Sequence, residues 1–182
     1  MSKIIGISGK MQSGKDYATG VIQLTNEEFE NKKFASALKR TAGVMLHVDP
    51  KHFEVDKFKR AMIPQIPGMT YREFLVDLGT NVARNKYNPD FWVNRLFQEF
   101  TPFSSWVVSD VRFPNEAMAI ADHGGITIRM ERPDMKRPKK QDITETALDG
   151  WDFDYVVSVD DGDFMGLHSQ ILDIMEQESM MA

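Results

Sequence analysis

The feature that most constrains this chain is a glycine-rich turn near its start, GKMQSGKD at residues 9–16. The run Lys3–Ser8 before the turn is short and mostly apolar, which is typical of a buried strand. After the turn, Ala18, Val21 and Ile22 fall on one face of a helix. Backbone N–H groups in such a turn, at the positive end of the helix dipole, form an anion nest. The sequence therefore predicts a phosphate-binding loop.

One residue of the loop departs from the usual pattern. Asp16 stands where a Ser or Thr hydroxyl normally meets Mg²⁺. One interpretation is that Asp16 binds the metal directly or through a water, because Mg²⁺ prefers oxygen ligands. The other is that its carboxylate stabilises the start of the following helix. Lys15 is expected to contact the β- and γ-phosphates, and Lys10 and Ser13 lie inside the loop.

A second acidic position follows an apolar run later in the chain. Trp106–Asp110 is typical of a central strand that ends in an acid, and Arg112 and Glu116 come soon after it. Parallel sheets bind ligands at the carboxyl ends of their strands, so we expect Asp110 near a metal and Arg112 near a phosphate. The alternative is an ordinary strand-end turn with a surface salt bridge.

Further basic residues suggest contacts with a second phosphate and a cover over the site. Lys39 and Arg72 each lie early in a predicted helix, whereas Arg40 is interpreted as a solvated surface charge. Residues 133–142, PDMKRPKKQD, are basic and contain two prolines. We expect this stretch to be a lid that closes over ATP and excludes water, with a merely solvated loop as the alternative.

The remaining apolar runs alternate between strand and helix patterns. A helix is predicted from Thr70, with Glu73 completing a capping box. Other helices are expected at about 37–46, 115–123 and 164–175, and a short one near 52–62. Strands are expected at 3–8, 34–35, 106–110, 126–130 and 155–159. This alternation predicts an α/β fold of three layers, α/β/α, with a central parallel sheet of about five strands.

Composition excludes several classes of protein. The 182 residues suit a single domain, and the absence of cysteine excludes disulfides and thiolate metal sites and fits a reducing cytoplasm. The net charge of −5 argues against binding to a nucleic-acid polymer. No apolar run is long enough for a membrane span, and no signal peptide is expected.

Taken together, these motifs resemble those of the bacteriophage deoxynucleoside monophosphate kinases, a branch of the P-loop nucleoside monophosphate kinase fold. The matching stretches follow the family's order and span most of the chain. They are SGKMQSGKD (8–16), ASALK (35–39), YREFLVDLGTNVARNKYNPDFWV (71–93), SDVRFPNEA (109–117), IRMERP (128–133) and ITETALD (143–149). The region 47–70 is shorter than in some members, which leaves the accepted bases open.

The resemblance implies an enzyme that uses ATP and Mg²⁺ to phosphorylate a deoxynucleoside monophosphate (dNMP), in the host cytoplasm if phage-encoded. It implies one kinase domain over 1–182, with an acceptor-side helical region at about 36–100 and a lid at about 133–143. The residues implied on the donor side are Gly9, Lys10, Gln12, Ser13, Gly14, Lys15, Asp16, Tyr17 and Arg132. Those implied on the acceptor side are Lys39, Arg72, Gly79, Thr80, Trp92, Asp110, Arg112 and Glu116. The catalytic set would be Lys15, Arg72, Asp110 and Arg112, and the metal ligands Asp16 and Asp110. Glu145 receives no assigned contact.

Two alternatives stay open on the sequence. Animal-type phosphomevalonate kinases carry a similar loop and a related fold, although the LGT to FW block of residues 78–92 is closer to the phage kinases. A non-enzymatic ATP-binding switch or assembly protein would lack a second phosphate pocket, which the basic set Lys39, Arg72 and Arg112 argues against. The long amphipathic helices are also compatible with a homodimer.

Overall fold

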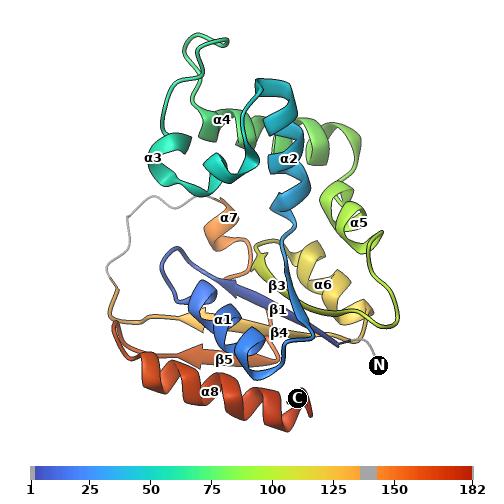
Figure 1. Cartoon of the computed structure of the whole chain (residues 1–182), viewed down its shortest axis with the longest axis vertical. Helices are drawn as coiled ribbons and strands as arrows, with labels where there is room; N and C mark the ends of the chain where they lie inside the picture. The colour runs from blue at the N-terminus through green and yellow to red at the C-terminus, as the bar shows by residue number, and fades with distance from the viewer. Residues whose placement is uncertain (1–2, 136–142, 182) are drawn as a thin grey trace. The chain divides into compact units, whose positions relative to one another are not determined.

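A five-stranded parallel sheet forms the centre of one of the two compact units into which the chain divides. In the computed structural model, which describes residues 3–135 and 143–181, the first unit is Met1–Lys33 with Phe100–Ala182. The second unit is Phe34–Glu99. Most helices and strands of both units are labelled in Figure 1.

The sheet of the first unit has the strand order β2-β3-β1-β4-β5, and every neighbouring pair is parallel. Its strands are β1 (Lys3–Gly9), β2 (Phe29–Lys32), β3 (Ser105–Val111), β4 (Ile126–Glu131) and β5 (Tyr155–Ser158). Its helices are α1 (Lys15–Thr25), α6 (Pro114–Asp122), α7 (Ile143–Thr146) and α8 (Phe164–Gln177). The expected α/β fold with a parallel sheet of about five strands is thereby confirmed.

Alternate side chains of the strands build a core on each face of the sheet. On one face, Ile5 and Ile7 of β1 are fully buried in a cluster with apolar residues of α1 and α8. On the other face, α6 approaches so closely that a Cβ added to Gly6 would lie 2.5 Å from Ile120 Cδ1. Gly6 is therefore needed for helix α6 to pack directly on β1.

Strand β3 changes register beside β1. Gly6 is paired with Val108 and Ser8 with Val111, so β1 advances by two residues where β3 advances by three. The extra residue is a β-bulge, a feature that re-aims side chains and is frequent next to active sites. It lies at residues 109–110, so that Asp110 stands in the irregular part of β3, one residue before the strand ends.

The second unit is helical. Its elements are α2 (Ala35–Leu46), the 3₁₀-helix η1 (Pro50–Glu54), α3 (Asp56–Lys59), α4 (Tyr71–Val76), η2 (Asp77–Tyr87) and α5 (Phe91–Phe97). Phe53, Ile63 and Tyr71 form its buried core with residues of α2. Helix α4 starts at a capping box in which Thr70 Oγ1 accepts from Glu73 N–H and Glu73 Oε2 accepts from Thr70 N–H. This is the start that the sequence predicts.

Helix η2, which continues α4, is a π-helix over eleven residues. Most π-helical segments are single turns inside α-helices, so a segment of this length is unusual. Its first turn is fixed from outside: Trp92 Nε1 donates to Gly79 O at 3.0 Å, and a Cβ on Gly79 would lie 2.7 Å from Leu38 Cδ2. The wider register therefore coincides with a close contact between Gly79 and the Leu38 side chain.

One expected strand is wrong. The sequence predicts a strand at Phe34–Ala35, but Ala35 begins helix α2, and the strand is β2 at Phe29–Lys32. Only Phe29 of β2 is buried, because β2 lies at the edge of the sheet. A strand with one buried side chain has too little apolar pattern to be recognised.

The predicted lid falls largely on residues that the structure does not describe. The basic core of the predicted lid, residues 136–142, lies outside the described residues, so the lid stays a prediction.

Among residues 3–135 and 143–181, none of the helices combines the length and the apolar character that crossing a membrane would require.

Candidate functional site

The predicted phosphate loop joins β1 to α1. Gly14 adopts a left-handed conformation, with φ 95°, directly before α1, and Gln12 has φ 63°, which is uncommon for a residue with a side chain. The turn is closed by a hydrogen bond from Ser13 N–H to Lys10 O at 3.2 Å. The glycines at both ends of this loop and its position before a helix match the predicted anion nest.

Glycine is required at the first position of this loop. Gly9 lies at the end of β1, and a Cβ there would be 2.4 Å from Ser13 Oγ and 2.8 Å from Met130 O. The second contact involves backbone of β4, which cannot rotate away. The loop therefore folds back tightly onto the sheet.

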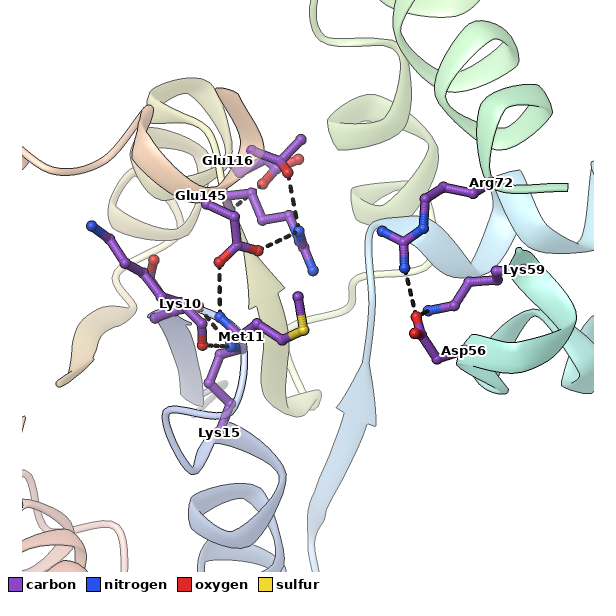
Figure 2. Close-up of polar contacts among 12 residues, drawn as sticks. Lys10, Met11, Lys15, Asp56, Lys59, Arg72, Glu116 and Glu145 are labelled. Atoms are coloured by element: carbon purple, nitrogen blue, oxygen red, sulfur yellow. Dashed lines mark hydrogen bonds and ion pairs between the residues drawn. The ribbon is translucent and has the colours of Figure 1, made fainter. Parts of the chain in front are cut away.

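Lys15 turns its ammonium group back onto the loop. Its Nζ donates to Gly9 O at 2.6 Å and to Lys10 O at 2.7 Å (Figure 2). Burial lowers the pKa of Lys15 to about 8, and the nearby positive charge of Arg112 adds to this shift. The cation is thus held in place by carbonyl groups, partly stripped of water, in the position from which it can meet a phosphate.

Two buried polar groups beside the loop have no hydrogen-bond partner within the described part of the chain. They are Ser13 Oγ and Arg132 Nε. Arg132 is 8% exposed, pairs with Asp161, and has its Nη2 3.5 Å from the position of a Cβ on Gly14. A buried unpartnered group costs free energy, so two of them beside an anion nest fit a site completed by a ligand.

Arg112 follows the bulged strand β3. Its backbone N–H donates to Glu116 Oε2 at 2.7 Å, and that same oxygen accepts from Phe113 N–H at 3.1 Å. Glu116 is only 2% exposed, so it acts here as a buried cap of helix α6 that fixes the turn carrying Arg112. The Arg112 guanidinium itself is half-exposed and donates to Thr144 Oγ1 at 3.2 Å and to Glu145 Oε1 at 3.3 Å.

Glu145, for which no contact was predicted from the sequence, also reaches the loop. Its Oε2 accepts from the backbone N–H of Met11 at 2.8 Å (Figure 2). Four residues on, Asp149 pairs with Lys10 Nζ at 3.3 Å and with Arg129 Nη2 at 2.9 Å. Arg129 is buried, and its contact with Ser8 Oγ at 3.3 Å ties this acid to the end of β1.

The two candidate metal ligands, Asp16 and Asp110, come from different elements of the first unit. Asp16 is exposed in the first turn of α1, and Asp110 is half-buried in β3. In the described ranges, 3–135 and 143–181, no cluster of three or more acids or histidines is found. Mg²⁺ can be bound by one or two carboxylates together with several waters and phosphate groups, so the assignment of Asp16 and Asp110 as ligands stays a prediction.

The predicted acceptor residues lie in the second unit, apart from Asp110, Arg112 and Glu116. Lys39 pairs with Glu54 at 2.7 Å. Arg72 pairs with Asp56 at 2.6 Å, as Figure 2 shows. Asp56 also pairs with Arg60 at 2.6 Å and with Lys59 at 3.6 Å. We call Lys39, Lys59, Arg60 and Arg72 the cation cluster.

The charges of the cation cluster act on one another. Burial alone would raise the pKa of Asp56, but the charges of Arg60, Arg72 and Lys59 together outweigh this effect and lower it. Burial lowers the pKa of Lys59, and Arg72 and Lys39 lower it further. Lys59 and Arg60 were not singled out from the sequence, because 56–60 is a charged stretch without an apolar pattern. A carboxylate surrounded by three cations occupies the kind of site that a phosphate takes.

The other three predicted acceptor residues lie on η2 and α5. Gly79 and Trp92 are buried and bonded to each other, whereas Thr80 is half-buried. Tyr17, predicted on the donor side, is exposed in α1 and packs against Phe164, with ring centroids 5.2 Å apart. The roles of all these residues in binding stay predictions.

Comparison with known proteins gives one family. The profile of the deoxynucleotide monophosphate kinase family matches residues 47–171. A protein of Acanthamoeba polyphaga mimivirus named "Putative deoxynucleotide monophosphate kinase" is 27% identical over 197 residues, covering 98% of each chain. The crystal structure of TT1252 from Thermus thermophilus matches with a TM-score of 0.53 and 17% identity over 97% of each chain. At this identity the structural match shows a common fold.

Proposed function

Because the chain belongs to the deoxynucleotide monophosphate kinase family, we propose that it transfers the γ-phosphoryl group of ATP to the 5′-phosphate of a dNMP. An oxygen of the acceptor phosphate forms a bond to the γ-phosphorus, and the bond from that phosphorus to the β–γ bridging oxygen breaks. The products are a deoxynucleoside diphosphate and ADP. The acceptor oxygen is already ionised, so no general base is needed, and the work is positioning and charge stabilisation.

The observation that carries this proposal is the glycine loop with Lys15 held at its mouth. Loop N–H groups and the ammonium of Lys15 would bind the β- and γ-phosphates, in exchange for the carbonyl contacts that Lys15 now makes. Ser13 and Arg132, with their unpartnered buried groups, would complete the donor site. Gly9, Lys10, Gln12, Gly14, Asp16 and Tyr17 are the other proposed donor residues.

The acceptor phosphate is proposed to be bound by basic side chains. Lys39 and Arg72 were proposed from the sequence. The ion pair with Asp56 supports Arg72, because an acceptor phosphate would replace that carboxylate as its partner, and Lys39, now paired with Glu54, would do the same. Gly79, Thr80 and Trp92 are proposed to border the nucleoside. Arg112 would stabilise the transferring phosphoryl group, with Glu116 fixing its backbone.

Magnesium is proposed to be held by Asp16 and Asp110 together with nucleotide phosphates. When bound, the ion would neutralise charge on the phosphate oxygens. The two carboxylates would otherwise repel ATP. Asp16→Asn is therefore expected to raise the Mg²⁺ concentration that gives half-maximal rate. If Asp16 only stabilised the helix, the same substitution would lower the thermal midpoint of unfolding and leave the magnesium dependence unchanged.

The proposal is tested by coupled ADP release with ATP and a panel of acceptors. The panel contains each dNMP, the matching ribonucleoside monophosphates and phosphomevalonate. Turnover that depends on one or more dNMPs is the expected result. ATP hydrolysis that is the same with and without every acceptor would overturn it in favour of an ATP-binding switch, and a response to phosphomevalonate alone would overturn the acceptor class.

A further inference from the structure

Glu145 lies at the meeting point of two parts of the donor site. Each of its carboxylate oxygens has a different partner: Oε2 accepts from Met11 N–H at 2.8 Å, and Oε1 receives Arg112 Nη1 at 3.3 Å. Met11 belongs to the phosphate loop, and Arg112 follows β3. One side chain from α7 therefore contacts Met11, 134 positions earlier in the chain, and Arg112, 33 positions earlier.

The loop needs such a contact at this point. The residue after Met11 is Gln12, whose left-handed φ of 63° is unfavourable for a residue with a Cβ. Strained backbone of this kind persists where surrounding contacts hold it. The bond from Met11 N–H to Glu145 fixes the Lys10–Met11 peptide, which directly precedes the part of the turn that contains Gln12.

Arg112 needs a second contact for a different reason. Its backbone is held by Glu116, but its guanidinium is 44% exposed and sits on a long flexible side chain. Thr144 and Glu145, neighbours on α7, both accept from its Nη1. These two acceptors restrict the guanidinium to the side of the site where the loop lies, and ordering a side chain before substrate binds lowers the cost of ordering it later.

The segment that carries Glu145 is itself anchored. Leu148 is 3% exposed, and Asp149 is bonded to Lys10 and to buried Arg129. The side chain of Glu145 is 19% exposed, so its carboxylate is partly shielded from water. A partly shielded, charge-assisted contact is stronger than a surface ion pair.

We propose that Glu145 is a positioning residue, which fixes the turn of the phosphate loop through Met11 N–H and orients Arg112 for phosphoryl transfer. It touches neither nucleotide in this role and acts through the two groups it holds. The inference rests on the proposed function for its kinetic consequences. The structural half, the protection of the Met11 amide, holds whatever the acceptor is.

The kinetic test separates positioning from general destabilisation. Glu145→Ala is expected to lower kcat by about tenfold to a hundredfold, since a small misplacement of a group that acts in the transition state has effects of this size. The KM for ATP should change by less. Glu145→Gln retains an acceptor for Met11 N–H and should recover most of the rate. Glu176→Ala, which changes an exposed acid on α8, is the matched control and should behave as wild type.

A double-mutant cycle tests whether Glu145 acts through Arg112. In the Arg112→Ala background, Glu145→Ala should lower kcat by clearly less than it does in the wild type, because the group it orients is gone. Fully multiplicative effects would overturn the part of the proposal that concerns Arg112. A wild-type kcat in Glu145→Ala would overturn the proposal as a whole.

Hydrogen exchange distinguishes failure of this inference from failure of the proposed function. With no nucleotide or acceptor present, the Met11 amide should exchange slowly in wild type and Glu145→Gln and faster in Glu145→Ala. Equal exchange in all three proteins would overturn the loop contact even if dNMP kinase activity is found. If no acceptor is phosphorylated but the Met11 amide loses protection in Glu145→Ala, the contact stands and the proposed reaction falls.

Discussion

The phosphate loop of the first unit and the cation cluster of the second would both bind phosphate, but they are built from different materials. The loop presents backbone N–H groups on a glycine turn, with Lys15 partly buried and bonded to backbone carbonyls. The cluster presents side chains that are paired with Asp56 and Glu54, and its two arginines are exposed. Backbone groups carry no titratable charge, whereas side-chain cations are screened by salt and are changed by single substitutions.

This difference suggests a division of tasks. A loop fixed by backbone would suit the polyphosphate of the donor, which does not change with the acceptor. A cluster of side chains is easier to alter and suits the acceptor, whose identity differs among kinases. Substitutions and changes of pH or salt should therefore act differently on the two regions.

The largest effect is expected from Lys15→Met in the loop. Removing a cation that stabilises charge in the transition state should lower kcat by roughly a hundredfold to a thousandfold. The folded state should be no less stable, because the substitution also removes the burial of an ammonium group. Steady-state kinetics and thermal melting measure the two quantities, with Lys86→Met, at an exposed site, as the control. A kcat within a factor of a few of wild type would contradict the role of Lys15.

A smaller effect is expected in the cation cluster. Arg72→Ala should raise the KM for the dNMP by about tenfold to a hundredfold, the value of one or two charge-assisted hydrogen bonds. The KM for ATP should stay close to wild type. The control is Arg95→Ala, which removes an ion pair of similar length, 2.9 Å to Glu99, in the same unit.

Salt sharpens this second prediction. The KM for the dNMP should rise with ionic strength in the wild type and much less in Arg72→Ala, because exposed charges are screened. An equal rise of both KM values in Arg72→Ala would mean that Arg72 supports the fold of the enzyme rather than the acceptor.

The pH dependence of nucleotide binding should follow Lys15. In the free protein its pKa is about 8, so the ammonium form predominates below pH 8 and is lost above it. A bound phosphate favours the charged form and raises the pKa of Lys15. ATP affinity should therefore be highest below pH 8 and should fall by up to about tenfold per pH unit above it.

Titrations of ATP binding between pH 6.5 and 9.5 give the measurement, and Lys15→Met should remove most of the slope. An affinity that is constant across this range in the wild-type protein would contradict the prediction. The cation cluster makes the matching contrast, because its arginines keep their charge throughout this range.

The smallest effect concerns the cap of the helix that carries Arg72. Thr70→Ala removes the acceptor for Glu73 N–H and should lower the free energy of unfolding by about 1 kcal/mol. The KM for the dNMP should rise only slightly, because Arg72 keeps its pair with Asp56. Urea denaturation measures the first quantity. A loss of stability well above that value would mean that the capping box also supports the core of the second unit.

The same contrast between regions explains what could be predicted from the sequence. Strands β1, β3, β4 and β5 and helices α1, α2, α6 and α8 were expected at nearly their observed positions, because each has an apolar pattern of its own. The phosphate loop was found because its residues are contiguous and its chemistry depends on local backbone. The edge strand β2 was missed because only Phe29 of it is buried.

Features that depend on contacts between residues far apart in the chain were not predicted from the sequence. The Met11–Glu145 bond joins residues 134 positions apart, and no local pattern indicates it. The π-helical register of η2 goes with contacts of Gly79 to Trp92 and Leu38, which lie on other helices. The cluster around Asp56 gathers cations from α2, α3 and α4 and the residue after α3, so its members looked like separate surface charges.

The bulge in β3 has a consequence for how this enzyme can vary. Val107 packs in the core shared with α1 and α8, whereas Val111 lies beside Gly6 and Ile120 under α6. In a regular strand these two valines, four positions apart, would share one face. The extra residue moves Val111 to the opposite face and releases Asp110 from the alternation. The length of β3 therefore matters as well as its composition. Removing one residue at 109–110 would keep both valines packed on their present faces. It would, however, return Asp110 to the regular alternation of side chains along the strand. Insertions and deletions should be tolerated far less at this point than any conservative exchange of its side chains.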